Sequence, residues 1–158
     1  MTKPSFDLRK WQHFLALGFG SGLAPKAPGT FGTLAALPLI FLLAMLTPAW
    51  SMTLIVLAAV LGIYICGKVS ADIGAEDHGA IVWDEVVGFA LTMWAVPLTF
   101  SNVVVGFALF RLLDIVKPWP IRWFDRHVHG GLGVMLDDIV AGLLACALLH
   151  GVWLPLQF

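Results

Sequence analysis

Residues 130–142, GGLGVMLDDIVAG, place two adjacent carboxylates, Asp137 and Asp138, between a glycine-rich segment and a long apolar run. An ionised carboxylate beside hydrocarbon costs roughly 2.5–3.5 kcal/mol even on lenient insertion scales, so such an acid needs a cation or a metal as its partner. The glycines predict a flexible approach and the apolar run predicts a helix. We therefore expect both acids at the mouth of that helix.

A second acidic pair has the same setting. In residues 83–88, WDEVVG, Asp84 and Glu85 precede another apolar run. An acid just before a helix accepts hydrogen bonds from free backbone N–H groups, which would explain Asp84 and Asp137 as helix caps but not their neighbours. Successive helical residues point about 100° apart, so each pair offers oxygens in two directions. We expect the two helix mouths to face a shared site.

The composition predicts an integral membrane protein. Of 158 residues, 59% are hydrophobic and 12% are charged, and the mean hydropathy is +0.91. A soluble domain is roughly 45–50% apolar. The length fits one domain, residues 1–158. We expect membrane lipids as partners and no nucleic acid.

The charged residues fall in three blocks, because residues 27–67, 86–110 and 139–158 contain none. A helix needs about 20 residues to cross roughly 30 Å of hydrocarbon, so the first charge-free stretch is long enough for two crossings. We expect the break between them at residues 46–51, LTPAWS. The proline there lacks an N–H donor and disfavours helix in the residue before it.

The stretch 86–110 fits one span or a hairpin of two short helices bent at residues 97–102, PLTFSN. The hairpin returns the later basic residues to the side of the earlier ones, as the positive-inside bias requires. The earlier basic residues are Lys3, Arg9, Lys10 and Lys26, and the later ones are Lys117, Arg122 and Arg126. A last segment, 139–154, ends near Trp153, placed like an interfacial anchor. We predict about five membrane helices, with the N-terminus and every charge at the cytoplasmic face.

At the N-terminus, Ser5 before Phe6 and Asp7 predicts a helix cap. The helix would run through Trp11 and Phe14 and lie on the membrane surface. The expected fold class is an all-α integral membrane bundle with short membrane helices and this N-terminal amphipathic helix.

Residues 110–123, FRLLDIVKPWPIRW, carry a second polar group. Arg111, Asp114 and Lys117 recur every three residues along one stripe of a helix that Pro118 should end. One interpretation is an ion pair between Arg111 and Asp114, with the lysine reaching towards the membrane surface. In the other, Asp114 joins the carboxylates, while Arg111 and Lys117 bind an anionic group.

Residues 18–33, GFGSGLAPKAPGTFGT, are rich in glycine and precede the first membrane helix. Their backbone N–H groups could approach an anion there, with Lys26 and Thr30 as substrate-binding candidates. Glycine-rich connectors before helices are common, so this pattern alone indicates only a connector.

Four blocks occur in order between about residue 20 and residue 144: LAPKAPGTFGTLAALPL, then VWDEVVG, then FRLLDIVKPWPI with Asp125 shortly after, then GGLGVMLDDIVAG. Together they resemble the phosphatidylglycerophosphatase A family of bacterial lipid phosphatases. The resemblance implies a multi-pass inner-membrane enzyme that uses Mg²⁺ to remove the terminal phosphate of phosphatidylglycerophosphate, giving phosphatidylglycerol. The matching motif positions are Asp84, Glu85, Arg111, Asp114, Lys117, Asp137 and Asp138.

Mg²⁺ suits such acids, because it is commonly held by one or two carboxylates while phosphate oxygens and waters complete its octahedron. The predicted catalytic residues are Asp138, Asp137, Glu85, Asp84 and Asp114, and the first four are also the predicted metal ligands. Arg111 and Lys117 would stabilise charge on the phosphate oxygens. Attack by water and an aspartyl-phosphate on Asp138 or Asp114 are the two alternatives for the chemical step.

Two other classes of protein fit part of the pattern. A CDP-alcohol phosphotransferase would also be a small bundle with acids at helix mouths, but its ordered run DGxxAR followed by GxxxDxxxD is absent from this sequence. A small transporter or scaffold with intramembrane acids would carry charges at mid-membrane depth or on both faces. Here the charges are expected on one face.

Overall fold

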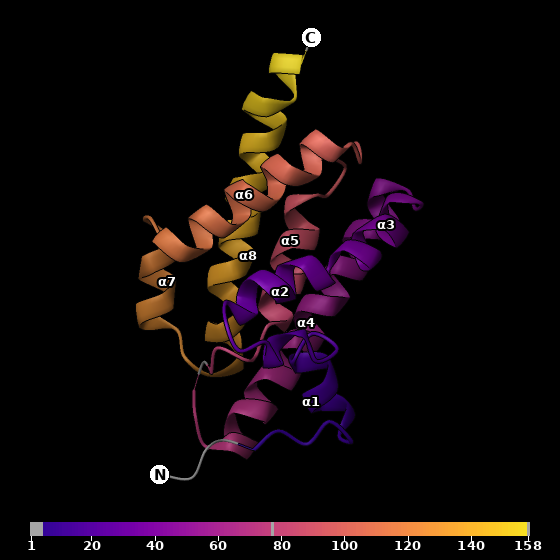
Figure 1. Cartoon of the computed structure of the whole chain (residues 1–158). Helices are drawn as coiled ribbons and strands as arrows, with labels where there is room; N and C mark the ends of the chain where they lie inside the picture. The colour runs from indigo at the N-terminus through magenta and orange to yellow at the C-terminus, as the bar shows by residue number, and fades with distance from the viewer. Residues whose placement is uncertain (1–4, 77, 158) are drawn as a thin grey trace.

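The computed structural model describes residues 5–76 and 78–157, and the regular secondary structure of these residues is entirely helical, as predicted (Figure 1). Lys3, one of the basic residues used to predict the topology, lies outside the described residues. The helices are α1 (Trp11–Ala16), α2 (Pro28–Ala35), α3 (Leu37–Ala44), α4 (Pro48–Ile73), α5 (Trp83–Thr92), α6 (Phe100–Val116), α7 (Ile121–His127) and α8 (Gly130–Leu148). A π-helical turn, Leu149–Trp153, and a 3-10 turn, Pro155–Gln157, extend α8.

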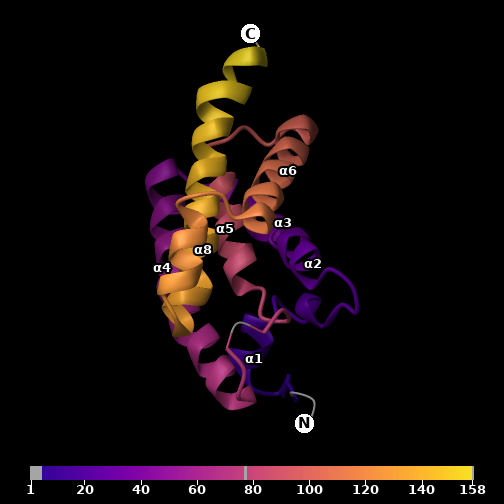
Figure 2. The ribbon, with the colours of Figure 1, turned by 90° about the vertical axis from the view of Figure 1, so that its left-hand side faces the viewer.

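Helix α5 lies at the centre of the bundle, where it packs against α4 and α8 and also contacts α2, α3 and α6 (Figures 1 and 2). Nine of its ten residues are buried, and Glu85 is the exception. Helix α1 and the C-terminal turn Pro155–Gln157 lie at opposite ends of the bundle in both views. Because α5 is short and almost fully enclosed, its side chains contact the neighbouring helices rather than the surroundings of the protein.

The predicted break at residues 46–51 is confirmed. Helix α4 begins at Pro48, and the side chain of Thr47 caps it by accepting a hydrogen bond from the backbone N–H of Trp50 at 3.5 Å. A second interruption, not predicted, divides α2 from α3 at Ala36. Pro38 lies directly after it, and a proline cannot donate the backbone hydrogen bond that a continuous helix would require.

The predicted hairpin within residues 86–110 is also confirmed, since α5 and α6 are separate helices. Their connector occupies residues 93–99, slightly earlier than the expected bend at 97–102. The hydroxyl of Thr99 accepts a hydrogen bond from the backbone N–H of Asn102 at 3.2 Å and so starts α6 at Phe100.

The expectation that Asp137 and Asp138 stand at a helix mouth is wrong. Helix α8 begins at Gly130, so both acids lie about two turns inside it. The capping interpretation is wrong as well. The N-cap of α8 is His129 and that of α5 is Val82, so Asp84 lies in the first turn of α5 and caps nothing.

Close packing explains why the glycine-rich segment is helical. A Cβ at Gly131 would lie 2.0 Å from the carbonyl oxygen of Ile63 and 2.8 Å from the backbone nitrogen of Gly67, both on α4. On α8 and α5, a Cβ at Gly142 would lie 2.4 Å from the carbonyl oxygen of Gly88. Small residues allow helix backbones to approach closely, and this packing overrides the low helix propensity of glycine.

The N-terminal helix starts later than predicted. Ser5 does not cap it, because Asp7 accepts a hydrogen bond from the backbone N–H of Arg9 at 3.0 Å and forms a turn, and α1 begins only at Trp11. Trp11 and Phe14 are exposed on α1, as a surface-lying helix requires. Its contact with a membrane stays a prediction.

The C-terminal tryptophan is held by the bundle. The indole N–H of Trp153 donates to the side-chain oxygen of buried Asn102 on α6 at 2.9 Å, and the side-chain amide of Gln157 donates to the same oxygen at 2.6 Å. Trp153 therefore ties the end of the chain to α6, a contact that the predicted anchor role did not include.

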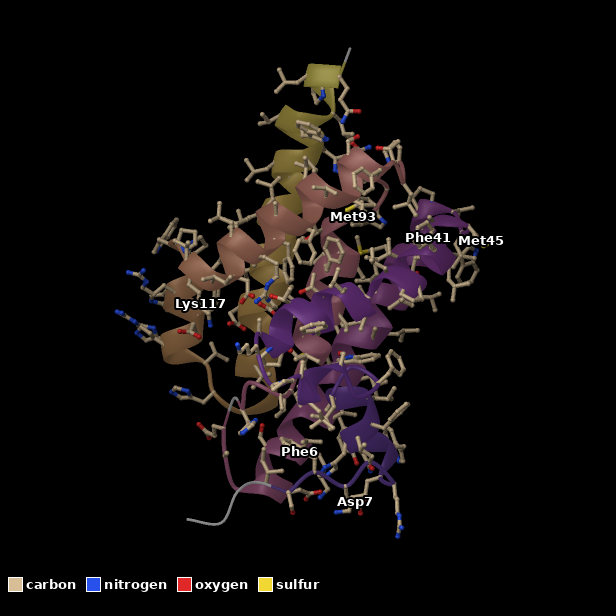
Figure 3. All side chains as sticks on the ribbon, in the orientation of Figure 1. Phe6, Asp7, Phe41, Met45, Met93 and Lys117 are labelled. Atoms are coloured by element: carbon tan, nitrogen blue, oxygen red, sulfur yellow. The ribbon has the colours of Figure 1, made fainter. Side chains whose placement is uncertain are left out.

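Two helices are long and apolar enough to cross a membrane: α4, and α8 with its extension to Gln157. Both helices meet this requirement by their length and composition alone. Nitrogen- and oxygen-tipped side chains gather around α7 and the N-terminal segment, whereas the end that carries Phe41 and Met45 is dominated by carbon (Figure 3). These features indicate membrane association, and the five predicted membrane segments stay a prediction.

The close contact of α5 with α8 predicts that Gly142→Ala lowers the melting temperature of the detergent-solubilised protein. The new methyl group would meet the backbone of Gly88, which cannot rotate away, and overpacking costs typically about 1–3 kcal/mol. For a chain of this size, each kcal/mol corresponds to about 2–4 °C, measurable by circular dichroism.

The matched control is Gly151→Ala, because a Cβ at Gly151 has no neighbour within 4 Å. Its effect on stability should stay within about 0.5 kcal/mol. Equal melting temperatures for the two variants would contradict the glycine-mediated contact.

Candidate active site

Three carboxylates from two helices meet at one point. Asp84 and Glu85 in the first turn of α5 and Asp138 within α8 each present an oxygen, and these oxygens lie within 4.8 Å of one another. Gly88 follows Asp84 by four residues and Gly142 follows Asp138 by four, so each acid lies one helical turn from a contact glycine on the same helix face. The close approach of the glycines therefore directs Asp84 and Asp138 towards each other.

This three-carboxylate cluster is almost closed to solvent. Asp84 is 7% exposed and Asp138 is 2% exposed. One side-chain oxygen of Asp84, Oδ1, and one of Glu85, Oε2, are buried without a hydrogen-bond partner among the described residues. Buried carboxylates that lack partners are costly, and three neighbouring negative charges repel one another, so the cluster needs protons or a cation. An all-oxygen donor set with unused oxygens fits Mg²⁺.

Arg111 on α6 brings a positive charge to the cluster. Its Nη1 contacts Oδ2 of Asp114 and lies 3.8 Å from Oε1 of Glu85. The predicted pair of Arg111 and Asp114 is therefore confirmed. Asp114 also lies next to Asp138, as the interpretation that joins it to the carboxylates requires. Arg111 keeps donor capacity, because its Nε has no partner among the described residues.

The start of α2 covers this arrangement. A Cβ at Gly29 would lie 2.3 Å from Oε1 of Glu85 and 3.0 Å from both terminal nitrogens of Arg111, so a larger residue there would displace the tips of these two side chains. The glycine-rich residues 18–33 thus reach the site through Gly29, which the sequence analysis did not single out. Thr30 is the next residue of α2, and Lys26 is exposed in the turn before it. The substrate-binding roles of Thr30 and Lys26 stay predictions.

A second polar cluster surrounds Lys117. Its Nζ donates to Oδ2 of Asp137 at 2.7 Å and also contacts Oδ1 of Asp125 on α7. Burial disfavours the charged form of Lys117, but the hydrogen bonds that it donates to Asp125 and Asp137 outweigh this effect and raise the pKa of Lys117 above its usual 10.5. The ammonium group is therefore retained at neutral pH.

The backbone of Lys117, the residue that makes these contacts, is strained. The residue ends α6 with φ 46° and ψ 60°, in the left-handed region that few residues other than glycine adopt. Pro118 follows and prevents continuation of the helix, as predicted. Strained backbone of this kind is frequent at functional sites.

The two clusters separate the adjacent acids Asp137 and Asp138, because neighbouring residues of a helix point in different directions. Asp138 joins Asp84 and Glu85, whereas Asp137 binds Lys117. Asp137, one of the four predicted metal ligands, is thus not part of the three-carboxylate cluster. Asp125 is a candidate that residue spacing did not single out, and only its place after the third sequence block indicated it.

A family model described as phosphatidylglycerophosphatase A matches residues 14–153. The chain belongs to the phosphatidylglycerophosphatase A family. The resemblance predicted from the four sequence blocks is thereby confirmed. No solved structure matches the chain significantly.

Curated relatives are similar over most of the chain. A phosphatidylglycerophosphatase A of Escherichia coli is 49% identical over 95% of this chain and 88% of the relative. One of Haemophilus influenzae is 44% identical over 89% of this chain and 87% of the relative. A protein of Bacteroides thetaiotaomicron, named provisionally as a phosphatidylinositol-3-phosphatase, is 39% identical over 94% of this chain and 95% of the relative. All three relatives carry the names of lipid phosphatases.

The second cluster predicts that Lys117→Met destabilises the protein, because Asp125 and Asp137 would lose their shared cation. Breaking a fully buried ion pair costs about 3–5 kcal/mol, and we expect about 1–3 kcal/mol here because the Lys117 side chain is 26% exposed. Thermal unfolding in detergent measures the difference. Lys10→Met, which removes an exposed lysine, should have a smaller effect.

The same comparison has a defined pH dependence. Since the pKa of Lys117 is raised on folding, its stabilising contribution is complete below pH 10.5 and is lost as the pH rises further. The difference between wild type and Lys117→Met should therefore be smaller at pH 11 than at pH 7. A constant difference would show that the charge of Lys117 is not responsible.

Proposed function

We propose that this protein hydrolyses the terminal phosphomonoester of phosphatidylglycerophosphate, giving phosphatidylglycerol and phosphate, and that the reaction depends on Mg²⁺. The observation that carries the proposal is the convergence of Asp84, Glu85 and Asp138 beside the guanidinium of Arg111. Carboxylates for a divalent cation next to a basic group for an anion are the donor set that phosphoryl transfer requires. The names of the relatives supply the lipid substrate.

Asp84, Glu85 and Asp138 would hold the Mg²⁺. When bound, Mg²⁺ would neutralise phosphate charge and lower the pKa of a water molecule. We assign Asp137 to Lys117 rather than to the metal, because its carboxylate already accepts a hydrogen bond from that ammonium.

Arg111 is placed to bind the phosphate. Glu85 and Asp114 flank its guanidinium and fix its direction, and the planar group can donate two parallel hydrogen bonds to phosphate oxygens. As the oxygen of water bonds to phosphorus, the ester P–O bond breaks and the glycerol oxygen leaves with a proton. Arg111 would stabilise the negative charge spread over the remaining phosphate oxygens during this step.

Lys117 would act beside Arg111 as a second positive group. Two of the three ammonium donors are used by Asp125 and Asp137, which leaves one for an anion. The same contacts also connect α6 and α7 to α8 at the residue next to Asp138. Lys117 therefore has a positioning role in addition to its proposed contact with substrate.

We further propose that the protein crosses the bacterial inner membrane several times, with the site at the cytoplasmic face. Helices α3, α4, α5, α6 and α8 alternate in direction along the bundle (Figure 1). The basic residues of α7 and of the N-terminal segment share the more polar part of the molecule (Figure 3), as the positive-inside bias requires. A phosphorylated lipid headgroup would reach the acids from that side.

The decisive experiment measures phosphate release by the purified protein from phosphatidylglycerophosphate, phosphatidylinositol 3-phosphate and phosphatidic acid. We expect hydrolysis chiefly of phosphatidylglycerophosphate, its loss with a chelator, and its recovery with Mg²⁺. Asp138→Asn should reduce the rate by about 100-fold or more, because it removes a charged ligand from the metal site.

Asp7→Asn is the control, since it removes one exposed carboxylate far from the three-carboxylate cluster along the chain, and its rate should match wild type. Binding of Mn²⁺, followed by electron paramagnetic resonance without any substrate, should weaken in Asp84→Asn and Asp138→Asn alike. Faster hydrolysis of another lipid would contradict the proposed substrate. Hydrolysis that continues in the presence of a chelator would contradict the proposed role of Mg²⁺.

The topology has its own test. A reporter fused to the C-terminal end should appear periplasmic, and one inserted at Gly79, in the loop between α4 and α5, should appear cytoplasmic. A cytoplasmic C-terminal reporter would overturn the proposed number of crossings.

A further inference from the structure

Helix α7 carries a basic and aromatic surface that the proposed reaction leaves unused. Its inner face is committed to the bundle: Ile121 is fully buried and Asp125, four residues later, contacts Lys117. Residues four apart share a helix face, so Arg122 and Arg126 form an adjoining stripe. Figure 3 shows nitrogen-tipped side chains projecting from α7 away from the bundle, beyond the labelled Lys117.

This surface is hollowed. A cavity of about 460 Å³ elsewhere in the protein is lined mainly by apolar residues, but the hollow at α7, about 290 Å³, combines aromatic and cationic side chains. It is lined by Pro118, Trp119, Arg122, Trp123, Arg126 and His127. The stacked rings of Trp123 and His127, with centroids 4.8 Å apart, form part of its wall.

The two arginines lack acidic partners. Among residues 5–76 and 78–157, neither Arg122 nor Arg126 forms an ion pair with a carboxylate, and Asp125 is engaged by Lys117. Arg122 donates one hydrogen bond, to the carbonyl oxygen of Val116 at 3.4 Å, and its remaining donors are available. The hollow therefore has a net positive charge and can accept an anion.

Its aromatic side chains favour a lipid over a soluble anion. Trp119 is 83% exposed and Trp123 is 50% exposed. Two large indoles left open beside arginines match the headgroup level of a membrane, where the apolar body of tryptophan meets acyl chains and its N–H meets polar groups. Arginine recognises phosphate by paired hydrogen bonds.

We propose that this hollow binds the phosphate of an anionic membrane phospholipid, with Arg122 and Arg126 on the headgroup and Trp119 and Trp123 on the glycerol and acyl region. The inference rests on the proposed membrane location. Pro118 lines the hollow directly after Lys117 in the chain, so a lipid bound there lies beside the second polar cluster. The site would hold anionic lipids next to the active site without taking part in hydrolysis.

The test uses the full-length protein in phosphatidylcholine vesicles and follows quenching of tryptophan fluorescence by lipids with brominated acyl chains. Brominated phosphatidylglycerol should quench more than brominated phosphatidylcholine at the same mole fraction. Trp119→Phe/Trp123→Phe should remove this excess. Arg122→Gln/Arg126→Gln should raise the mole fraction needed for half of the excess on the order of tenfold, whereas Arg122→Lys/Arg126→Lys should retain most of the preference.

Arg9→Gln/Lys10→Gln is the matched control, because it removes two exposed positive charges from another part of the protein. An equal loss in this control would mean that general surface charge, not a site at α7, attracts the lipid. Equal quenching by the two brominated lipids, or displacement by millimolar soluble glycerol 3-phosphate, would also overturn the proposal.

The measurement requires no turnover, so it is independent of the proposed reaction. Asp138→Asn should lose hydrolysis and keep the excess quenching. Excess quenching in a wild-type protein that releases no phosphate would refute the proposed function and support the lipid site. Phosphate release without excess quenching would support the proposed function and refute the lipid site.

Discussion

The contact between α5 and α8 depends on the absence of side chains at Gly88 and Gly142. Each glycine lies one turn beyond an acid on its own helix, so the approach of the two backbones also determines the separation of Asp84 and Asp138. Attraction between the acids cannot bring them together, because like charges repel. Backbone packing therefore holds an arrangement that electrostatics opposes, and a divalent cation would relieve the opposition.

Two neighbouring residues of α8 serve different clusters for the same geometric reason. Asp138 faces α5, whereas Asp137 faces Lys117 and, through it, α7. This division gives one cluster an excess of negative charge and provides the other with a cation. It also connects the placement of α7 to the placement of the carboxylates, since Lys117 contacts acids from both α7 and α8.

Much of the fold follows from local chemistry that is visible in the sequence. Pro48 and Thr47 determine where α4 begins, Pro118 prevents α6 from continuing, and the three-residue spacing of Arg111 and Asp114 predicts their pairing. A shared site for the two acidic pairs was also predicted, and Asp84, Glu85 and Asp138 do converge. The predicted helix mouth is correct for the pair on α5 and wrong for the pair on α8.

The errors arise where distant parts of the chain determine local structure. Glycines 130, 131 and 133 suggest a flexible segment, but a glycine can also mark a close helix contact, and at Gly131 only the position of α4 distinguishes the two. Gly29 was overlooked for a related reason, because its importance comes from Glu85 and Arg111 rather than from its neighbours. The pattern DxxxG, shared by residues 84–88 and 138–142, was the signal that could have revealed the shared contact.

The left-handed turn at Lys117 has an implication for which amino acids the position can accept. A glycine would adopt φ 46° without strain, yet it would leave Asp125 and Asp137 sharing a site with no cation between them. The backbone conformation thus favours glycine at position 117, whereas the two neighbouring carboxylates favour lysine. The lysine supplies the positive charge but strains the backbone, so the turn remains under conformational tension for as long as the protein is folded.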